Sequence, residues 1–380
     1  MINNNLKQRG VVSLFIVVFA ALLITVVSIG FVGIMVQDQQ QASTADLSQS
    51  AYDSAQAGVE DAKRALLLYQ SICNDDATSC AAAKAKIDSA TSPACNVAVE
   101  TLDDIKNIVT PDGEVKIQTS GSNSLDQAYT CVKVKLNTAD YLGVLSSNDY
   151  DVIPLNSVGA FNTVQIQWFS SLDVSADKNF AVDLQQSAST PLFTQSLWPS
   201  NRPPIMQVQL IQFGSNGFNL SDLESANNND TLFLYPSSAG ASTTSFINDS
   251  HQTPTGKPKS VQCVNSLLSG GYACSVNLTL PNPVGGGDRT AFLRISAIYN
   301  NTNFKVALLN TITPVDFNGV QPEIDSTGRA NDLFRRVKSR VKLIDANFPY
   351  PDAAVVLTGN FCKSFIITDS ASDYINSCSP

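Results

Sequence analysis

An uncharged apolar run near the start of the chain constrains its fold more than any other feature. Residues 11–36 read VVSLFIVVFAALLITVVSIGFVGIMV, which is 26 residues without a charged side chain. A helix of this length extends about 39 Å, more than the ~30 Å hydrocarbon core of a bilayer. A helix buried in a soluble core is seldom apolar on all sides over so many turns. The sequence therefore predicts a transmembrane segment at 11–36.

The charges beside this run set its expected orientation. Lys7 and Arg9 precede the run, whereas Gln37, Asp38 and further glutamines follow it. Positive charge holds its flank in the cytoplasm, so we expect a single-pass membrane protein with a cytoplasmic N-terminus and an extracytoplasmic C-terminus. A cleaved secretory signal is the competing interpretation, but its apolar region usually spans about 7–15 residues. The longer run favours retention of the span.

The span passes without a proline into an amphipathic segment at 37–70. Apolar side chains recur there at steps of three or four residues, the spacing of one helix face. They are Leu47, Ala51, Ala55, Val59, Ala62, Leu66 and Tyr69. Glu60 and Arg64 are spaced for an ion pair on another face. We expect one continuous helix from about residue 11 to residue 70, with its second half packed under a soluble domain.

The rest of the chain predicts mainly β structure. Residues 71–112 are typical of loop and short helix, with a helix at 81–88, and alternation of apolar and polar side chains begins after residue 113. Strands are expected at 130–136, 163–169, 206–213, 274–280 and 292–299, with a terminal strand in the basic segment 328–345. The predicted fold class is α+β: the long helix followed by an antiparallel β-rich ectodomain at 113–380, either a sandwich or two small sheets.

A cluster of prolines at 198–204 interrupts any regular element. It marks either a boundary between two β domains or a rigid crossover inside one, and the sequence favours neither.

The eight cysteines all follow the predicted span, and their even number fits an oxidising compartment with up to four disulfides. The candidate pairs are Cys263–Cys274, Cys362–Cys378, Cys95–Cys131 and Cys73–Cys80. The last pair requires the first helix to end between its members, because seven residues along a helix separate them by about 10 Å. Reduced, buried thiols are the alternative.

The composition gives little support to catalysis. The chain carries a net charge of −9 and one histidine, His251. A single histidine excludes a histidine-rich metal site, and the acidic balance disfavours a nucleic-acid surface. The sequence contains no nucleophile-elbow, P-loop or dinucleotide-binding motif. We therefore expect no enzyme activity, no catalytic residue, no metal site, no cofactor and no nucleic-acid partner.

Three features in order give the N-terminal region, about residues 7–66, its resemblance to a known family. A basic leader, Lys7-Gln8-Arg9-Gly10, abuts the span; the span continues as an amphipathic helix; and that helix contains SAQAGVEDA at 54–62. This region resembles the type IV prepilins and is most similar to the PilX-type minor pilins. The resemblance implies a leader at 1–10 that a prepilin peptidase cleaves between Gly10 and Val11, and an antiparallel sheet packed on the helix.

One position departs from the family pattern. Most pilins have a glutamate at the fifth residue of the mature chain, where it pairs with the N-terminal amine of a neighbouring subunit, and Phe15 stands there in this sequence. The resemblance then implies a minor pilin or pseudopilin-like subunit of a type IV pilus or related secretion filament, located at the tip or initiating assembly.

The partners expected for such a subunit are other pilins through the N-terminal helix and the inner-membrane assembly machinery. Its expected location is the membrane, then the cell surface or the pilus. The alternative hypothesis is a membrane-anchored adhesin or carbohydrate-binding ectodomain that recognises a surface ligand and never enters a filament.

Overall fold

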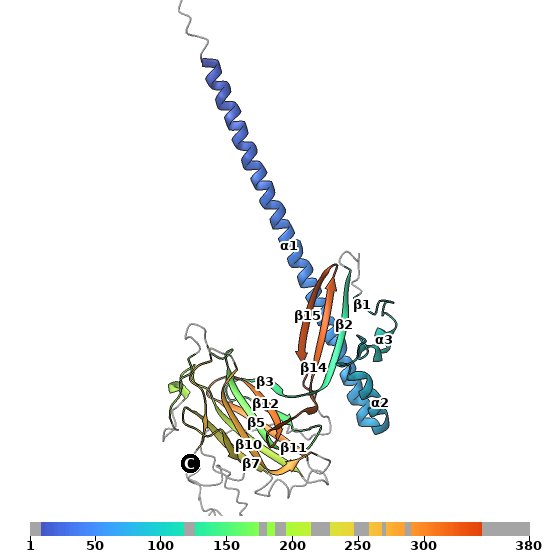
Figure 1. Cartoon of the computed structure of the whole chain (residues 1–380), viewed down its shortest axis with the longest axis vertical. Coiled ribbons are helices and arrows are strands. Elements are labelled where there is room, and N and C mark those ends of the chain that lie inside the picture. The colour runs from blue at the N-terminus through green and yellow to red at the C-terminus, as the bar shows by residue number, and fades with distance from the viewer. Residues whose placement is uncertain are drawn as a thin grey trace, which may run out of the picture. The chain divides into compact units, whose positions relative to one another are not determined.

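The computed structural model describes residues 9–117, 126–174, 181–186, 195–213, 229–246, 258–267, 271–285 and 290–343 (Figure 1). The helices are α1 Arg9–Asp75, α2 Ala77–Ile87, η1 Val99–Thr101, α3 Asp103–Lys106 and η3 Gln195–Leu197. The strands are β1 Val115–Lys116, β2 Gln127–Thr138, β3 Tyr141–Leu145, β4 Tyr150–Pro154, β5 Phe161–Ser170, β6 Ile205–Phe213, β7 Asn229–Ser237, β8 Thr243–Ser245, β9 Lys259–Gln262, β10 Tyr272–Val284, β11 Thr290–Ile298, β12 Thr302–Asn310, β13 Thr313–Val315, β14 Phe317–Ala330 and β15 Leu333–Arg340.

The chain divides into two compact units, one inserted into the other. The first, here called the helix–sheet unit, comprises the described residues of 9–136 and 322–341. The second, the sandwich unit, comprises those of 137–321 together with residues 342 and 343. The chain therefore leaves the helix–sheet unit at the end of β2 and re-enters it within β14. β2 and β14 are neighbours in one sheet although the whole sandwich unit separates them in sequence. Local sequence patterns therefore do not reveal the insertion.

The proline cluster at 198–204 is not where the chain divides. It lies inside the sandwich unit, between η3 and β6. Pro203 and Pro204 are buried, and the carbonyl of Pro204 accepts a hydrogen bond from the indole of Trp168. Arg202 pairs with Asp183 at 2.8 Å. The segment is thus a fixed crossover within one unit, the second of the two interpretations of the sequence.

Helix α1 is continuous from Arg9 to Asp75, which confirms the long helix and extends it by a turn. The chain then bends at Asp76, whose side chain accepts hydrogen bonds from the backbone N–H groups of Thr78 and Ser79 and so caps α2. Because the break falls between Cys73 and Cys80, their Cα atoms lie 4.3 Å apart and the disulfide forms. The first helix thus ends between Cys73 and Cys80, as this disulfide requires.

The helix–sheet unit holds α1 against a four-stranded sheet of order β1-β2-β14-β15. The pairings of β1 with β2 and of β14 with β15 are antiparallel, with Val115 opposite Tyr129 and Asp325 opposite Lys338. The helix face buried most completely in the fold contains Ala51, Ala55, Val59, Ala62 and Leu66, at 0–1% exposure. Five of the seven positions predicted for this face are therefore fully buried, as expected for helix-on-sheet packing.

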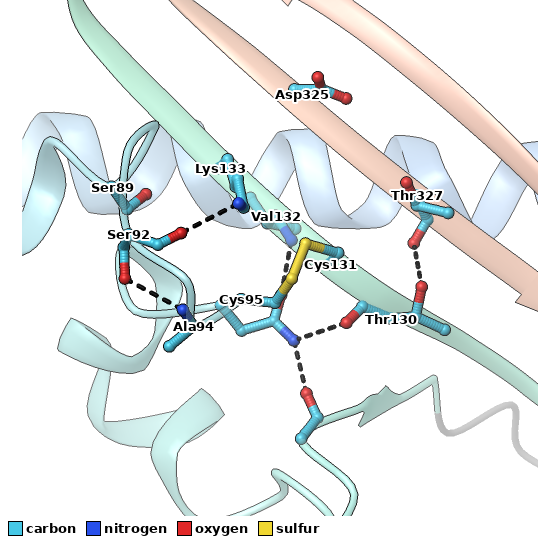
Figure 2. The surroundings of a disulfide bond; sticks show 12 residues. Ser89, Ser92, Ala94, Cys95, Thr130, Cys131, Val132, Lys133, Asp325 and Thr327 are labelled. Carbon is cyan, nitrogen blue, oxygen red and sulfur yellow. Dashed lines mark hydrogen bonds between the residues drawn. A yellow bond between two sulfur atoms is a disulfide. The ribbon is translucent and has the colours of Figure 1, made fainter.

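The segment after α2 closes one edge of this sheet (Figure 2). Side chains, rather than a strand, accept the outward N–H groups of β2: Asn96 from Val132 at 2.8 Å and Ser89 from Val134 at 3.0 Å. The Cys95–Cys131 disulfide fixes this segment to β2, with Cα atoms 4.8 Å apart. Covering an edge in this way removes a template for unwanted strand pairing.

The sandwich unit consists of two facing sheets around one core. The six-stranded sheet has the order β13-β12-β5-β10-β8, with β3 also paired to β12, and the five-stranded sheet has the order β4-β11-β6-β7-β9. Their inner faces meet in the core, which includes Trp168, Phe304, Val208, Leu234 and Leu293. The predicted strands are confirmed, and the antiparallel expectation holds except where β8 and β9 pair in parallel with β10 and β7.

A third disulfide lies in this unit. Cys263 and Cys274 face each other across an antiparallel bridge with Cα atoms 4.1 Å apart. Three of the four candidate pairs are thus confirmed. The Cys362–Cys378 pair lies outside the described residues.

Candidate functional site

The exposed half of α1, residues 14–36, is the most unusual surface of the described chain. Every side chain in it is exposed, and its large apolar members include Phe15 at 76%, Phe19 at 68% and Met35 at 70%. This helix is long and apolar enough to cross a membrane. Water opposes exposure of so much apolar surface, so the segment requires lipid or other apolar helices around it.

The predicted processing site lies at the start of this helix. α1 begins at Arg9, so the Gly10–Val11 peptide bond lies in its first turn. Phe15 follows a little more than one turn later and shares an apolar stripe with Phe19 and Leu23, which repeat at four-residue steps. The stripe contains no group that can form an ion pair with an amine.

The packed half of α1, residues 47–75, is built for close contact with the sheet. Gly58 meets β2 and β14 so tightly that an added Cβ would lie 2.5 Å from Ser326 Oγ and 2.8 Å from Val132 Cγ2. From the other side, a Cβ on Gly328 would lie 2.2–2.3 Å from backbone atoms of Ala55 and Ala51. The small residues of the 54–62 segment therefore have a structural reason: they let helix and sheet backbones approach.

A polar network fixes the helix beside this small-residue contact. The Tyr129 hydroxyl donates to Asp61 at 2.9 Å, and Arg64 joins Asp61 to Asp104 at 3.0 and 2.7 Å. Burial, with the neighbouring Asp61 carboxylate, raises the pKa of Tyr129. The predicted Glu60–Arg64 pair is not formed, because Glu60 bonds to Lys63 at 2.7 Å instead. The network ties α1 to β2 and α3.

The face of the sheet away from α1 carries charges that neutralise one another. Arg329 reaches Glu114 at 2.6 Å and Asp126 at 2.9 Å. Asp325 is bound by Arg336 on the neighbouring strand, and this contact lowers the pKa of Asp325. The basic segment predicted at 328–345 therefore contains strand β15, and most of its described cations are paired with carboxylates. Arg335 instead donates to the hydroxyl of Ser48.

A groove lies at the end of α1 within the helix–sheet unit. It has a volume of about 680 Å³ and is lined by the last turns of α1, by α2 and by the η1–α3 segment. Lys86, Glu100 and Lys106 contribute charges of both signs to its wall, and Tyr69 has its pKa raised mainly by burial. Its mixed charge selects no single class of ligand.

Within the described ranges, no group of three or more His, Cys, Asp or Glu side chains is arranged to hold a metal ion. Asp173 accepts hydrogen bonds from the backbone N–H groups of Ser170 and Asn303 at 2.7–3.1 Å. His251 lies outside the described residues.

The sequence predicted the helix and the three disulfides described above, but it did not indicate the roles of Gly328 and Tyr129. Both lie on strands whose contact with α1 depends on the fold. Gly328 stands at an inward-facing position of a strand, and a glycine there indicates that another backbone approaches closely. This pattern could have predicted the contact with α1.

No protein-family model, curated protein or solved structure matches this chain.

Proposed function

We propose that this chain is a minor pilin or pseudopilin-like subunit of a type IV pilus or related secretion filament, located at the tip or initiating assembly. The observation that carries the proposal is the division of α1 into two halves. Residues 14–36 are apolar and wholly exposed, and residues 47–75 pack on a four-stranded sheet in the same unit. The first half would pass from the membrane into a filament core of other pilin helices.

The tip position rests on Phe15 and on the inserted unit. Phe15 offers no carboxylate to the N-terminal amine of a neighbouring subunit. The missing ion pair costs little stability if no other subunit docks above this one. An ion pair in an apolar core would otherwise offset the cost of burying that amine. The sandwich unit adds residues 137–321 to the helix–sheet unit. A subunit of this size fits the end of a filament better than the repeating array of its shaft.

The experiment is to place an epitope tag at the C-terminus and to locate it by immunogold microscopy on purified filaments. We expect label at one end of each filament. Regular label along the shaft would contradict the tip position. Tagged protein that is present in the membrane but absent from filaments would favour the alternative, a membrane-anchored binding ectodomain.

A matched pair of variants tests the role of Phe15. Phe15→Glu restores the carboxylate at the position where pilins carry it, so we expect label to move into the shaft. Phe19→Glu places the same charge one turn away, on an equally apolar and exposed position, where the pilin pattern offers it no amine. We expect Phe19→Glu to reduce the amount of protein in filaments, because an unpaired carboxylate in an apolar surrounding is costly.

A further inference from the structure

The sandwich unit is inserted into the helix–sheet unit between two strands that lie side by side. β2 ends at Thr138 and β14 begins at Phe317, and the two strands are neighbours in the four-stranded sheet. The hydroxyl of Thr130 on β2 donates to the carbonyl of Thr327 on β14 at 3.3 Å. The chain therefore leaves this sheet and returns to it at adjacent positions, as it does across the turn of a β-hairpin.

The sandwich unit holds its own two ends together. Leu142, near its start, donates its backbone N–H to the side-chain oxygen of Gln321 at 2.9 Å, and the Gln321 amide donates to the Leu142 carbonyl at 2.7 Å. The hydroxyl of Thr138 also donates to the carbonyl of Gln321, at 3.3 Å. Gln321 is buried, and it is the last residue of this unit before the chain re-enters the helix–sheet unit. The entry and the exit of the sandwich unit are thus joined by hydrogen bonds within the unit.

Each unit also has a hydrophobic core of its own. The described residues of the sandwich core all lie between Tyr141 and Val320. In the helix–sheet unit, Gly58 of α1 lies against Val132 of β2 and Ser326 of β14, and both of these residues are 0% exposed. A compact unit that buries its own apolar side chains has the means to fold without its neighbour.

The described disulfides follow the same division. Cys73–Cys80 and Cys95–Cys131 lie in the helix–sheet unit, and Cys263–Cys274 lies in the sandwich unit. Each of these bonds closes a loop inside one unit, so it restricts the unfolded state of that unit alone. These three bonds therefore stabilise each unit without making it depend on the other.

We propose that the sandwich unit is a self-contained module carried by the helix–sheet unit, so that each unit folds without the other. If the sandwich unfolds, it becomes a long loop between β2 and β14, and the entropy cost of closing a loop grows only slowly with its length. If the helix–sheet unit unfolds, the hydrogen bonds of Gln321 still hold the ends of the sandwich together. Each unit then opens as a cooperative element of its own.

The consequence for assembly rests on the proposed function. The exposed half of α1 and the small-residue contact that supports this helix both belong to the helix–sheet unit. This unit alone contains what a filament core would receive, and the sandwich unit is a surface module whose folding does not decide entry. The contrary arrangement is one cooperative fold, in which loss of either core prevents entry.

Hydrogen exchange of the full-length protein in detergent, read by mass spectrometry, tests separate folding. Phe304→Ala removes a buried ring from the sandwich core and should speed exchange in β5 and β10 at least about tenfold, with peptides of 47–75 unchanged. Gly328→Val crowds the backbone of α1 and should have the reverse effect. Equal acceleration of both units by either variant would overturn the proposal. If a variant is not recovered, the milder changes Phe304→Leu and Gly328→Ala decide.

The amount of each variant in purified filaments, divided by its amount in the membrane, tests the consequence for assembly. We expect Phe304→Ala to enter filaments as the parent does. Gly328→Val should enter at least about tenfold less, since overpacking destabilises the unit that carries α1. Equal losses in the two variants would contradict this consequence. If the parent itself is absent from filaments, the proposed function fails and the consequence fails with it, whereas the exchange measurement still decides whether the units fold separately.

Discussion

The two halves of α1 are one uninterrupted helix in two different environments. In the exposed half, residues 14–36, large apolar side chains are exposed on every side of the helix. In the packed half, residues 47–75, the face toward the sheet carries alanines and Gly58. Glycines show the difference most directly: a Cβ added at Gly30 or Gly33 meets nothing within 4 Å, whereas one at Gly58 meets three side chains.

This contrast teaches that side-chain size on a helix reports the kind of partner. A folded sheet with a fixed backbone allows close approach only over small residues, as at Gly328 and Ala55. Fluid lipid, in contrast, accepts large apolar side chains anywhere on the helix surface. Placing the same side chain in each half of α1 tests whether the two halves differ in how tightly they are packed.

The largest effect is expected for Gly328→Val. The new Cβ would lie 2.2 Å from the backbone N of Ala55, and backbone in a helix cannot move aside as a side chain can. Overpacking against fixed atoms should destabilise the helix–sheet unit by about 3 kcal/mol or more. Hydrogen exchange of β14 and α1 peptides, read by mass spectrometry, should show faster exchange in this unit. The control is Gly33→Val, which should leave the exchange of these peptides unchanged.

Gly58→Ala against Gly30→Ala is the direct comparison within one helix. Alanine favours a helix by up to about 1 kcal/mol over glycine at either position. At Gly58 that gain is outweighed by contact with Ser326 and Val132, so we expect a net loss of about 1 to 2 kcal/mol. At Gly30 nothing opposes the gain. The same hydrogen-exchange measurement applies, and equal behaviour of the two variants would remove the distinction between the halves.

The helix was predictable because its signals are local. Absence of proline, the apolar run and the four-residue spacing of Ala51, Ala55 and Val59 act within a few turns of one another. The insertion was not predictable, since the pairing of β2 with β14 joins strands separated by the whole sandwich unit. The prolines at 198–204 left a domain boundary and a rigid crossover equally open, because a linker and a crossover have the same local composition.

The surroundings of Arg294 on β11 were hidden for a related reason. FLRISAIY at 292–299 predicted a half-buried strand, and that is correct. Whether Arg294 has a carboxylate near it depends on the registers of β4 and β6, which the strand's own sequence does not contain. The candidate processing site at Gly10 and Val11, in contrast, was read entirely from consecutive residues.

Tyr129→Phe should have a smaller effect on the packed half. It removes the hydrogen bond to Asp61, which is worth about 1 to 2 kcal/mol because the acceptor is charged. The raised pKa of Tyr129 adds a pH dependence. Its contribution is complete below the unfolded pKa of about 10 and is lost as pH rises above that value, because only the unfolded state then releases the proton.

Urea unfolding followed by circular dichroism at a series of pH values checks this expectation. The free energy of unfolding should fall more steeply above about pH 10 in the parent protein than in Tyr129→Phe. Parallel curves for the two proteins would show that Tyr129 does not contribute to the alkaline loss of stability.

The smallest effect is expected for Arg335→Ala. Arg335 donates to Ser48 Oγ at 2.6–2.8 Å, which links β15 to the first turn of the packed half, but the contact is exposed. Exposed polar contacts contribute about 0.5 kcal/mol or less. The urea midpoint should barely change, and a shift as large as that of Gly58→Ala would mean that the packed half depends on its polar rim rather than on its small residues.

The proposed pilin role requires the exposed half of α1 to enter a filament as a processed helix. The most direct test is intact-mass and N-terminal peptide mass spectrometry of the protein recovered from cells with an active prepilin peptidase. We expect a mature chain that begins at Val11 and retains residues 11–36. A chain that still begins at Met1 would contradict the pilin assignment and leave a membrane-anchored ectodomain.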